Sequence, residues 1–208
     1  MAAGLWNHSI QYYPVVLAAI PFGAQRGLDV GCGEGMLARE LRQRIPRVTA
    51  LDKHEASLQA ARNSDGGLGI DYVAGEFLTC ELEPGSFDFI CSVAALHHMD
   101  AAAGLRRMRE LLKPGGRLAI VGCARPSGLA DLPAEAGGMV VHRLHLLRKQ
   151  FLEMAAPTCW PPPETYAGMR RIAREVLPGA QFRRRHRRAG RSPASAANRR
   201  LPPGEDHC

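Results

Sequence analysis

The stretch GLDVGCGEGM, residues Gly27 to Met36, decides the fold of this chain. It opens with a short apolar run and then places single residues between three glycines, which are Gly31, Gly33 and Gly35. Apolar residues recur at intervals of four beyond it, at Leu37, Leu41 and Ile45, as one face of a helix requires. The stretch therefore predicts a strand, a tight glycine turn and a helix.

Strand-like and helix-like segments continue to alternate along the chain. Strands are expected at 48–52, 70–74, 87–93 and 117–123, and helices at 55–62, from Asp100 to the Lys113-Pro114-Gly115-Gly116 turn, at 139–154 and at 166–177. The segment 87–93, FDFICSV, is almost continuously apolar, which suits a strand buried on both faces of a parallel sheet. The pattern predicts an α/β fold with a single Rossmann-like, doubly wound sheet, mostly parallel, and helices on both faces.

Length and charge limit the classes of function. A chain of 208 residues suits one domain, and its formal charge of +7 comes mainly from residues 181–208, which hold eight arginines and two acids. We expect residues 181–208 to form a basic, disordered tail, because almost no large apolar side chain follows Phe182. The rest of the chain is nearly neutral and offers no general attraction for nucleic acid.

Cysteine usage and hydropathy indicate the compartment. The six cysteines form no CxxC pair, which is typical of a reducing environment, and no apolar segment approaches the length of about 18 residues that a membrane span needs. The sequence thus predicts a cytoplasmic protein without a membrane partner. No metal site is expected, because the neighbouring histidines His97 and His98 lack further ligands at suitable spacing.

The glycine turn predicts a ligand site. Ligands of open α/β sheets lie beyond the carboxyl ends of the strands, and Asp52 ends the next strand, where its carboxylate can accept both hydroxyl protons of a ribose. A dinucleotide fingerprint needs a small residue where this chain has Met36, and Glu34 would repel a pyrophosphate. These residues favour adenosine without phosphates over NAD, while a tight turn with no ligand stays open.

Five motifs occur in order: LDVGCGEG, ALD, YVAGEFL, FDFICSVAALHHM and LLKPGGRLAIVG. Together they resemble the class I S-adenosylmethionine-dependent methyltransferases of the small-molecule type 11/12 branch, from about Trp6 to Arg185. The resemblance implies S-adenosyl-L-methionine as cofactor and methyl transfer by direct in-line displacement to a small-molecule acceptor. It also implies a lid over residues 1–25 and a methyltransferase domain over 26–180.

The resemblance assigns residues to the cofactor. Asp29 is expected near the methionine ammonium, Asp52 at the ribose, and Glu76 at the adenine amino group, where the family more often has Asp. Tyr12 corresponds to a tyrosine that reaches the cofactor carboxylate. The expected cofactor-binding set also contains Gly31, Cys32, Gly33, Gly35, Lys53, Phe77 and Ser92.

His97 and His98 are the candidate catalytic residues. A histidine can act as a general base near neutral pH, although a histidine satisfied by hydrogen bonds at a strand end remains the alternative. If this stretch is extended, its neighbours point to opposite sides and only one faces the cleft. Substrate contact and plain packing stay equally open for Trp6, His8 and Tyr13.

The resemblance breaks off near Arg185, where the family adds further strands. We therefore expect the final β-hairpin to be incomplete, through an altered C-terminus or a natural tail. An S-adenosylmethionine-binding protein without catalysis is the alternative function. Nucleic-acid binding through the tail arginines is less favoured, because no aromatic residue follows Phe182 to stack on bases. The sequence does not predict an oligomeric state.

Overall fold

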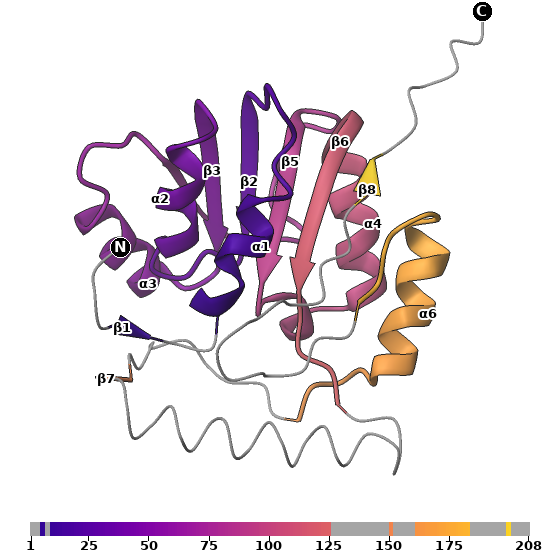
Figure 1. Cartoon of the computed structure of the whole chain (residues 1–208). Coiled ribbons are helices and arrows are strands. Elements are labelled where there is room, and N and C mark those ends of the chain that lie inside the picture. Colours follow the sequence, from indigo (N-terminus) through magenta and orange to yellow (C-terminus); the bar gives the residue numbers. More distant parts are fainter. Residues whose placement is uncertain (1–4, 7–8, 126–149, 152–160, 184–198, 201–208) are drawn as a thin grey trace, which may run out of the picture.

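A six-stranded sheet forms the centre of the molecule, with helices on both faces (Figure 1). The computed structural model describes residues 5–6, 9–125, 150–151, 161–183 and 199–200. The strand order is β4-β3-β2-β5-β6-β8, in which the first five strands are parallel and β8 is antiparallel to β6. These strands are β2 (Arg26–Val30), β3 (Arg47–Asp52), β4 (Asp71–Ala74), β5 (Phe87–Val93), β6 (Leu112–Val121) and β8 (Arg199–Arg200).

Helices follow the strands as the alternating pattern predicts. The α-helices are α1 (Tyr13–Leu17), α2 (Met36–Arg42), α3 (Glu55–Asn63), α4 (Ala101–Leu111) and α6 (Tyr166–Val176). Two 3-10 turns, η1 (Ile10–Tyr12) and η2 (Leu96–His98), precede α1 and α4. A separate two-stranded parallel sheet pairs β1 (Leu5–Trp6) with β7 (Gln150–Phe151). The sequence predicts a helix over 139–154, but Gln150 and Phe151 form this strand instead. The other residues of 139–154 lie outside the described residues.

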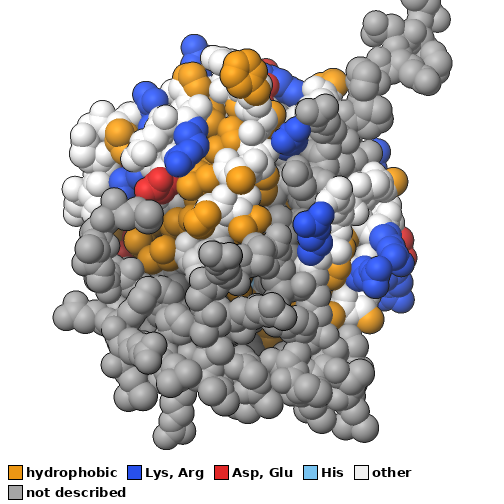
Figure 2. Space-filling view, in the orientation of Figure 1, with side chains coloured by type: hydrophobic (Ala, Val, Ile, Leu, Met, Phe, Trp, Pro, Cys, Tyr) orange, Lys and Arg blue, Asp and Glu red, His pale blue; other side chains and the backbone are white. Residues whose placement is uncertain are grey.

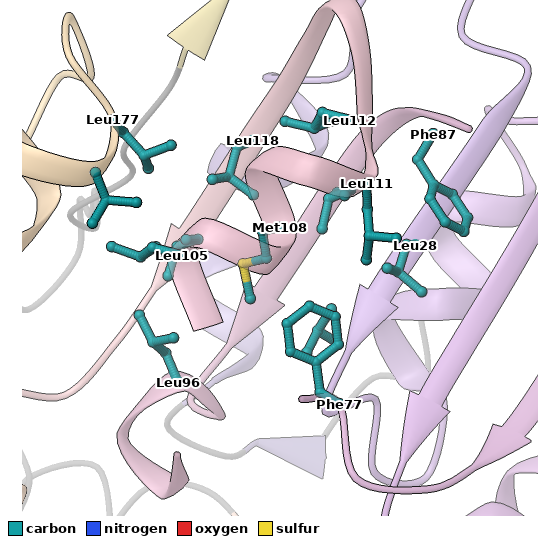
Figure 3. Packing of buried hydrophobic residues seen from close by; sticks show 14 of the residues in the cluster. Leu28, Phe77, Phe87, Leu96, Leu105, Met108, Leu111, Leu112, Leu118 and Leu177 are labelled. Atoms are coloured by element: carbon teal, nitrogen blue, oxygen red, sulfur yellow. The ribbon is translucent and has the colours of Figure 1, made fainter. Parts of the chain in front are cut away.

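The two faces of the sheet bury two separate hydrophobic clusters. Along β5, Ile90 belongs to the cluster under α4 and α6, whereas Phe89 and Cys91 belong to the cluster under α1 and α2. Figure 3 shows Leu105 and Met108 of α4 in the first cluster. The prediction that β5 is buried on both faces is confirmed, and this strand lies between β2 and β6.

The start of β6 differs from the sequence prediction. The Lys113-Pro114-Gly115-Gly116 segment does not separate α4 from the strand but lies within β6, which begins at Leu112. Phe87 pairs with Leu112 and Phe89 with Arg117, so the intervening residues bulge out of the ladder. Gly115 has φ +76°, which supplies the sharp turn within this bulge.

The last helix and the tail complete the described fold. Three arginines of α6 are exposed, namely Arg170, Arg171 and Arg174. Figure 2 shows basic side chains over this helix. Thr165 caps the helix by accepting a hydrogen bond from the Gly168 amide at 3.0 Å. Within 181–208, Arg199–Arg200 forms β8, and residues 184–198 and 201–208 lie outside the described residues.

Candidate active site

A cavity of about 140 Å³ lies at the carboxyl ends of β2, β3, β4 and β5. Among the described residues, its lining includes nine of the thirteen predicted site residues: Asp29, Gly31, Cys32, Gly33, Asp52, Lys53, Glu76, Phe77 and His98. Chain segments far apart in sequence meet here because parallel strands all end at one edge of the sheet.

The glycine turn forms one wall of the cavity. Gly31, Gly33 and Gly35 have φ of +74°, +53° and +71°, a region that favours glycine. A Cβ at Gly31 would lie 2.2 Å from the Cβ of Ala95, whereas a Cβ at Gly33 would meet no described atom within 4 Å. Glycine at 31 thus permits close approach of two loops, and glycine at 33 leaves cavity space open to a ligand.

Asp52 is held in place by backbone amides. Its Oδ2 accepts a hydrogen bond from the Gly33 amide at 2.8 Å, and its Oδ1 accepts one from the His54 amide at 2.9 Å. Both oxygens keep a second lone pair, so the carboxylate can also accept from two vicinal hydroxyls. The loops after β2 and β3 therefore orient this carboxylate before any ligand arrives.

Asp29 is a buried acid on the neighbouring strand. Its side chain is 1% exposed; Oδ1 accepts from the Cys91 thiol at 3.6 Å, and Oδ2 has no hydrogen-bond partner among the described residues. Burial raises the pKa of Asp29 to about 7, the Cys91 hydrogen bond opposes this shift, and the nearby charge of Asp52 adds to it. An under-satisfied acceptor in a cavity wall suits a cationic donor such as an ammonium.

Glu76 and Phe77 follow β4 on the adjacent side of the cavity. Lys53 Nζ lies 3.5 Å from Glu76 Oε1, with both side chains largely exposed. Phe77 is 3% exposed and joins the core as well as the cavity wall. The Gly75 amide donates to the Asp52 carbonyl at 3.0 Å, which ties this loop to the end of β3.

The two histidines lie in a 3-10 turn rather than in extended chain. Ala94, with φ +57°, turns the chain out of β5 into η2. His98 lines the main cavity, whereas His97 lines a second, smaller cavity, so one histidine faces the cleft although the backbone is not extended. The rings are 4.1 Å apart between centroids, and His97 Nδ1 has no hydrogen-bond partner in the described part of the chain.

Both histidines are neutral at pH 7. Burial, with a contribution from the charge of His98, lowers the pKa of His97 to about 4. Burial and the positive charge of Lys53 lower the pKa of His98, against an opposing effect of Asp52. A neutral imidazole at the cavity can accept a proton.

Two predicted residues near the glycine turn lie outside the cavity lining. Tyr12 packs against the hydrophobic cluster under α1, and the next residue, Tyr13, lines the cavity in its place. Gly35 precedes α2, where a Cβ would lie 2.9 Å from Tyr72 Oη. Gly35 is therefore required for packing at the start of α2.

Ser92 and His97 are the other predicted residues outside the main cavity. Ser92 is fully buried and its hydroxyl donates to the Val30 carbonyl at 3.0 Å, so it links β5 to β2. Sequence reasoning missed several lining residues, including His54, Gly75, Ala94, Ala95 and Met99. Their only signal in the sequence is that they adjoin predicted strand ends.

No group of three or more His, Cys, Asp or Glu side chains suited to a metal ion occurs among the described residues. Within the same ranges, none of the helices combines the length and the apolar character needed to cross a membrane.

Comparison with known proteins identifies the family. A family model described as "Methyltransferase domain" matches residues 28–120. Uncharacterized methyltransferases of Mycobacterium bovis and Mycobacterium tuberculosis are 39% identical over 183 residues, covering 86% of this chain and 91% of theirs. The chain belongs to the class I S-adenosylmethionine-dependent methyltransferases. This methyltransferase therefore uses S-adenosyl-L-methionine, as the resemblance of its motifs implies.

More distant relatives share parts of the molecule. Ubiquinone biosynthesis O-methyltransferases of Pseudomonas aeruginosa are 38% identical to the methyltransferase over 96 residues, or 44% of this chain and 41% of theirs. The YcgJ protein of Bacillus subtilis superimposes with a TM-score of 0.61 at 17% identity, covering 85% of this chain and 71% of that one. A putative methyltransferase of Bacillus halodurans gives a TM-score of 0.59 at 21% identity, over 84% and 71%. These structures confirm the α/β fold.

Proposed function

We propose that this methyltransferase methylates a small-molecule acceptor, with the cofactor held along Asp29, Asp52 and Glu76. The observation that supports this proposal most strongly is that one cavity is lined by two acids from neighbouring strands, Asp29 and Asp52, and by the neutral histidine His98. When bound, S-adenosylmethionine supplies an electrophilic methyl group.

We assign an acceptor in the cavity wall to each polar part of the cofactor. In this proposal the ammonium of the methionine moiety donates to Oδ2 of Asp29, which has no hydrogen-bond partner among the described residues. Asp52, already oriented by two amides, accepts from the ribose hydroxyls. Glu76 is placed to accept from the adenine amino group, beside the ring of Phe77. Gly33 also lines the cavity, and a Cβ at this position would meet no described atom within 4 Å.

His98 is proposed as the base on the acceptor side. It lines the cavity near the end of β5, and its lowered pKa keeps it neutral and able to take a proton from a hydroxyl or an amine. The remaining catalytic contribution is positioning, since holding two partners in reactive geometry lowers the barrier by several kcal/mol, up to about 7–11 in well-oriented systems.

The second cavity supports a small acceptor. The second cavity adjoins the main one at Met99 and has mostly apolar walls, including Leu96, Ala101 and Met169, which suits a short apolar group. The Pseudomonas relatives are named for an O-methylation in ubiquinone biosynthesis, which also supports a small molecule.

Calorimetric titration tests the cofactor site. We expect S-adenosylmethionine and S-adenosylhomocysteine to bind the wild type, NAD not to bind, and Asp52→Ala to lose the binding of both sulfur ligands. Asp71→Ala, which removes an exposed acid outside the cavity, is the matched control. Undiminished binding by a folded Asp52→Ala protein would contradict the proposed cofactor position.

The acceptor class needs a second experiment. Wild-type protein is incubated with a cell extract and a cofactor carrying a radiolabelled methyl group, and the extract is then separated by size. We expect the label in the small-molecule fraction and its loss in His98→Ala. Label in protein or nucleic acid would refute a small acceptor, and cofactor binding with no label anywhere would indicate binding without catalysis.

A further inference from the structure

The loop that follows β4 contains Glu76, which makes the proposed adenine contact, and the Glu76 side chain is exposed. Glu76 has an ion pair with Lys53 across 3.5 Å, but both side chains are largely exposed, and such pairs contribute little to order. A carboxylate that recognises one amino group must be held more firmly than this pair allows. The backbone of residues 75–80 therefore has to be fixed by other groups.

Within the loop the backbone makes one helix-like turn. The amides of Thr79 and Cys80 both donate to the Glu76 carbonyl, at 3.1 and 2.9 Å. A single turn leaves its later carbonyls without donors from a following turn, and these must find partners elsewhere. Phe77 and Cys80 carry two such carbonyls.

Arg107 of α4 supplies those donors. Its Nε donates to the Phe77 carbonyl at 2.7 Å, and its Nη2 donates to the Cys80 carbonyl. The guanidinium carbon also lies 5.8 Å from the centroid of the Phe77 ring. A planar guanidinium with a fixed set of donors can hold two carbonyls at once, which a lysine ammonium cannot do with the same geometry.

We propose that Arg107 is a positioning residue for adenine recognition, acting through the loop 75–80 on Glu76. The inference rests on the proposed function, in which Glu76 accepts from the adenine amino group. Arg107 does not line the cavity and touches no reacting atom. Its effect is to fix the backbone on which Glu76 and Phe77 stand, and so to set the preference for a base with an exocyclic amino group.

The test compares two ligands that differ at that group. S-Adenosylhomocysteine carries the amino group, and S-inosylhomocysteine has an oxo group in its place. We expect the wild type to prefer the first by about 10-fold, the scale of one charge-assisted hydrogen bond. In Arg107→Met, which keeps the apolar stem but removes the donors, the preference should fall to about 2-fold. Arg107→Lys should give an intermediate preference.

Arg109→Met is the matched control. Arg109 lies on the same helix and donates to the Val176 carbonyl at 3.2 Å, on the side away from the loop. It should lose stability to a similar degree while keeping the wild-type preference between the two ligands. Thermal unfolding of each variant separates a folding defect from a change in recognition. If Arg107→Met does not fold, the ligand preference is measured in Arg107→Lys instead.

Three results would overturn the inference: an unchanged preference in Arg107→Met, an equal loss of preference in Arg109→Met, or a wild type that binds both ligands equally. Failure of the wild type to bind S-adenosylhomocysteine at all would instead refute the proposed function. The two failures are therefore distinguishable.

Discussion

The two walls of the main cavity are built in different ways. The cofactor wall consists of the loops after β2, β3 and β4, where Asp52 is fixed by two backbone amides. The proposed acceptor wall is the segment 94–99, in which Ala94, Ala95, His98 and Met99 line the main cavity. His98 is exposed, whereas His97 lines the second cavity and its Nδ1 has no described hydrogen-bond partner. The backbone therefore positions Asp52 on the cofactor wall, whereas no described hydrogen bond fixes the His97 Nδ1 on the acceptor wall. Cofactor recognition should be more sensitive to backbone changes than acceptor recognition.

The largest expected effect comes from Gly31, where the two walls touch. Gly31→Val places a branched side chain at φ +74° and against Ala95, and the strain and overpacking together should lower the free energy of unfolding by roughly 2 to 5 kcal/mol. Gly33→Ala, which meets no described atom, should lose only about 1 kcal/mol. Urea unfolding measures both, and equal losses would refute a tight meeting of the walls.

Asp29 gives the cofactor wall a pH dependence of its own. Because its pKa is about 7 in the folded protein and near 3.8 when unfolded, the folded state binds more protons between these values, and its contribution to stability falls as pH rises from about 4 to 7. Asp29→Asn should remove this fall and be more stable at pH 8 by up to about 4 kcal/mol. Wild-type affinity for S-adenosylhomocysteine should rise over the same range, because an ammonium favours the ionised carboxylate.

These opposite trends can be measured in one series of buffers. Urea unfolding gives the stability and calorimetry gives the affinity for S-adenosylhomocysteine, for the wild type and for Asp29→Asn. A stability difference between the two proteins that does not change from pH 4 to 8 would contradict a buried, protonated Asp29.

His97 gives the acceptor wall the reverse dependence. Its pKa is lowered to about 4 in the folded protein, so the unfolded state binds more protons and stability falls as pH drops from about 6.5 to 4. His97→Leu should remove this loss of stability at low pH. Its free energy of unfolding at pH 5 should be higher by about 1 kcal/mol, because the variant lacks a buried nitrogen that has no described hydrogen-bond partner. His98→Leu, at an exposed position, should change the profile less. A larger effect at His98 than at His97 would contradict the different burial of the pair.

The smallest expected effect comes from Lys53, which interacts with Glu76 on the cofactor wall and with His98 on the acceptor wall. Lys53→Met should change stability by less than about 0.5 kcal/mol, because the Lys53–Glu76 ion pair is exposed. The same variant should raise the pKa of His98, since Lys53 contributes to lowering it. Nuclear magnetic resonance titration of His98 measures this shift. Lys113→Met, which removes a lysine paired with Asp88 away from the cavity, should leave the His98 pKa unchanged.

The sequence predicted the cofactor wall better than the acceptor wall, for a physical reason. Gly31, Asp29 and Asp52 occupy strand ends, and parallel strands bring their carboxyl ends to one edge whatever the packing details. The turn into η2 depends on Ala94 at φ +57°, a conformation that an alanine rarely adopts and that no local pattern signals.

Helix phase and strand irregularity account for the other differences. Tyr12 and Tyr13 are neighbours, and only the start of α1 at Tyr13 determines which ring lines the cavity. The Lys113-Pro114-Gly115-Gly116 segment has the composition of a turn that ends a helix, but the chain forms a bulge there and continues the ladder with β5. Local propensity predicts neither the tyrosine that lines the cavity nor the bulge in β6, because tertiary packing determines both.

The close approach of Gly31 to Ala95 also constrains how this chain can change over generations. With only 2.2 Å between the Cβ of Ala95 and the place where a side chain on residue 31 would begin, the two positions share one small volume. A larger residue at 95 is tolerated only while 31 stays glycine, and no residue at 95 relieves the positive φ at 31. The pair is therefore epistatic. Variation should collect at 95, with small residues, while 31 remains invariant among sequences that keep both walls.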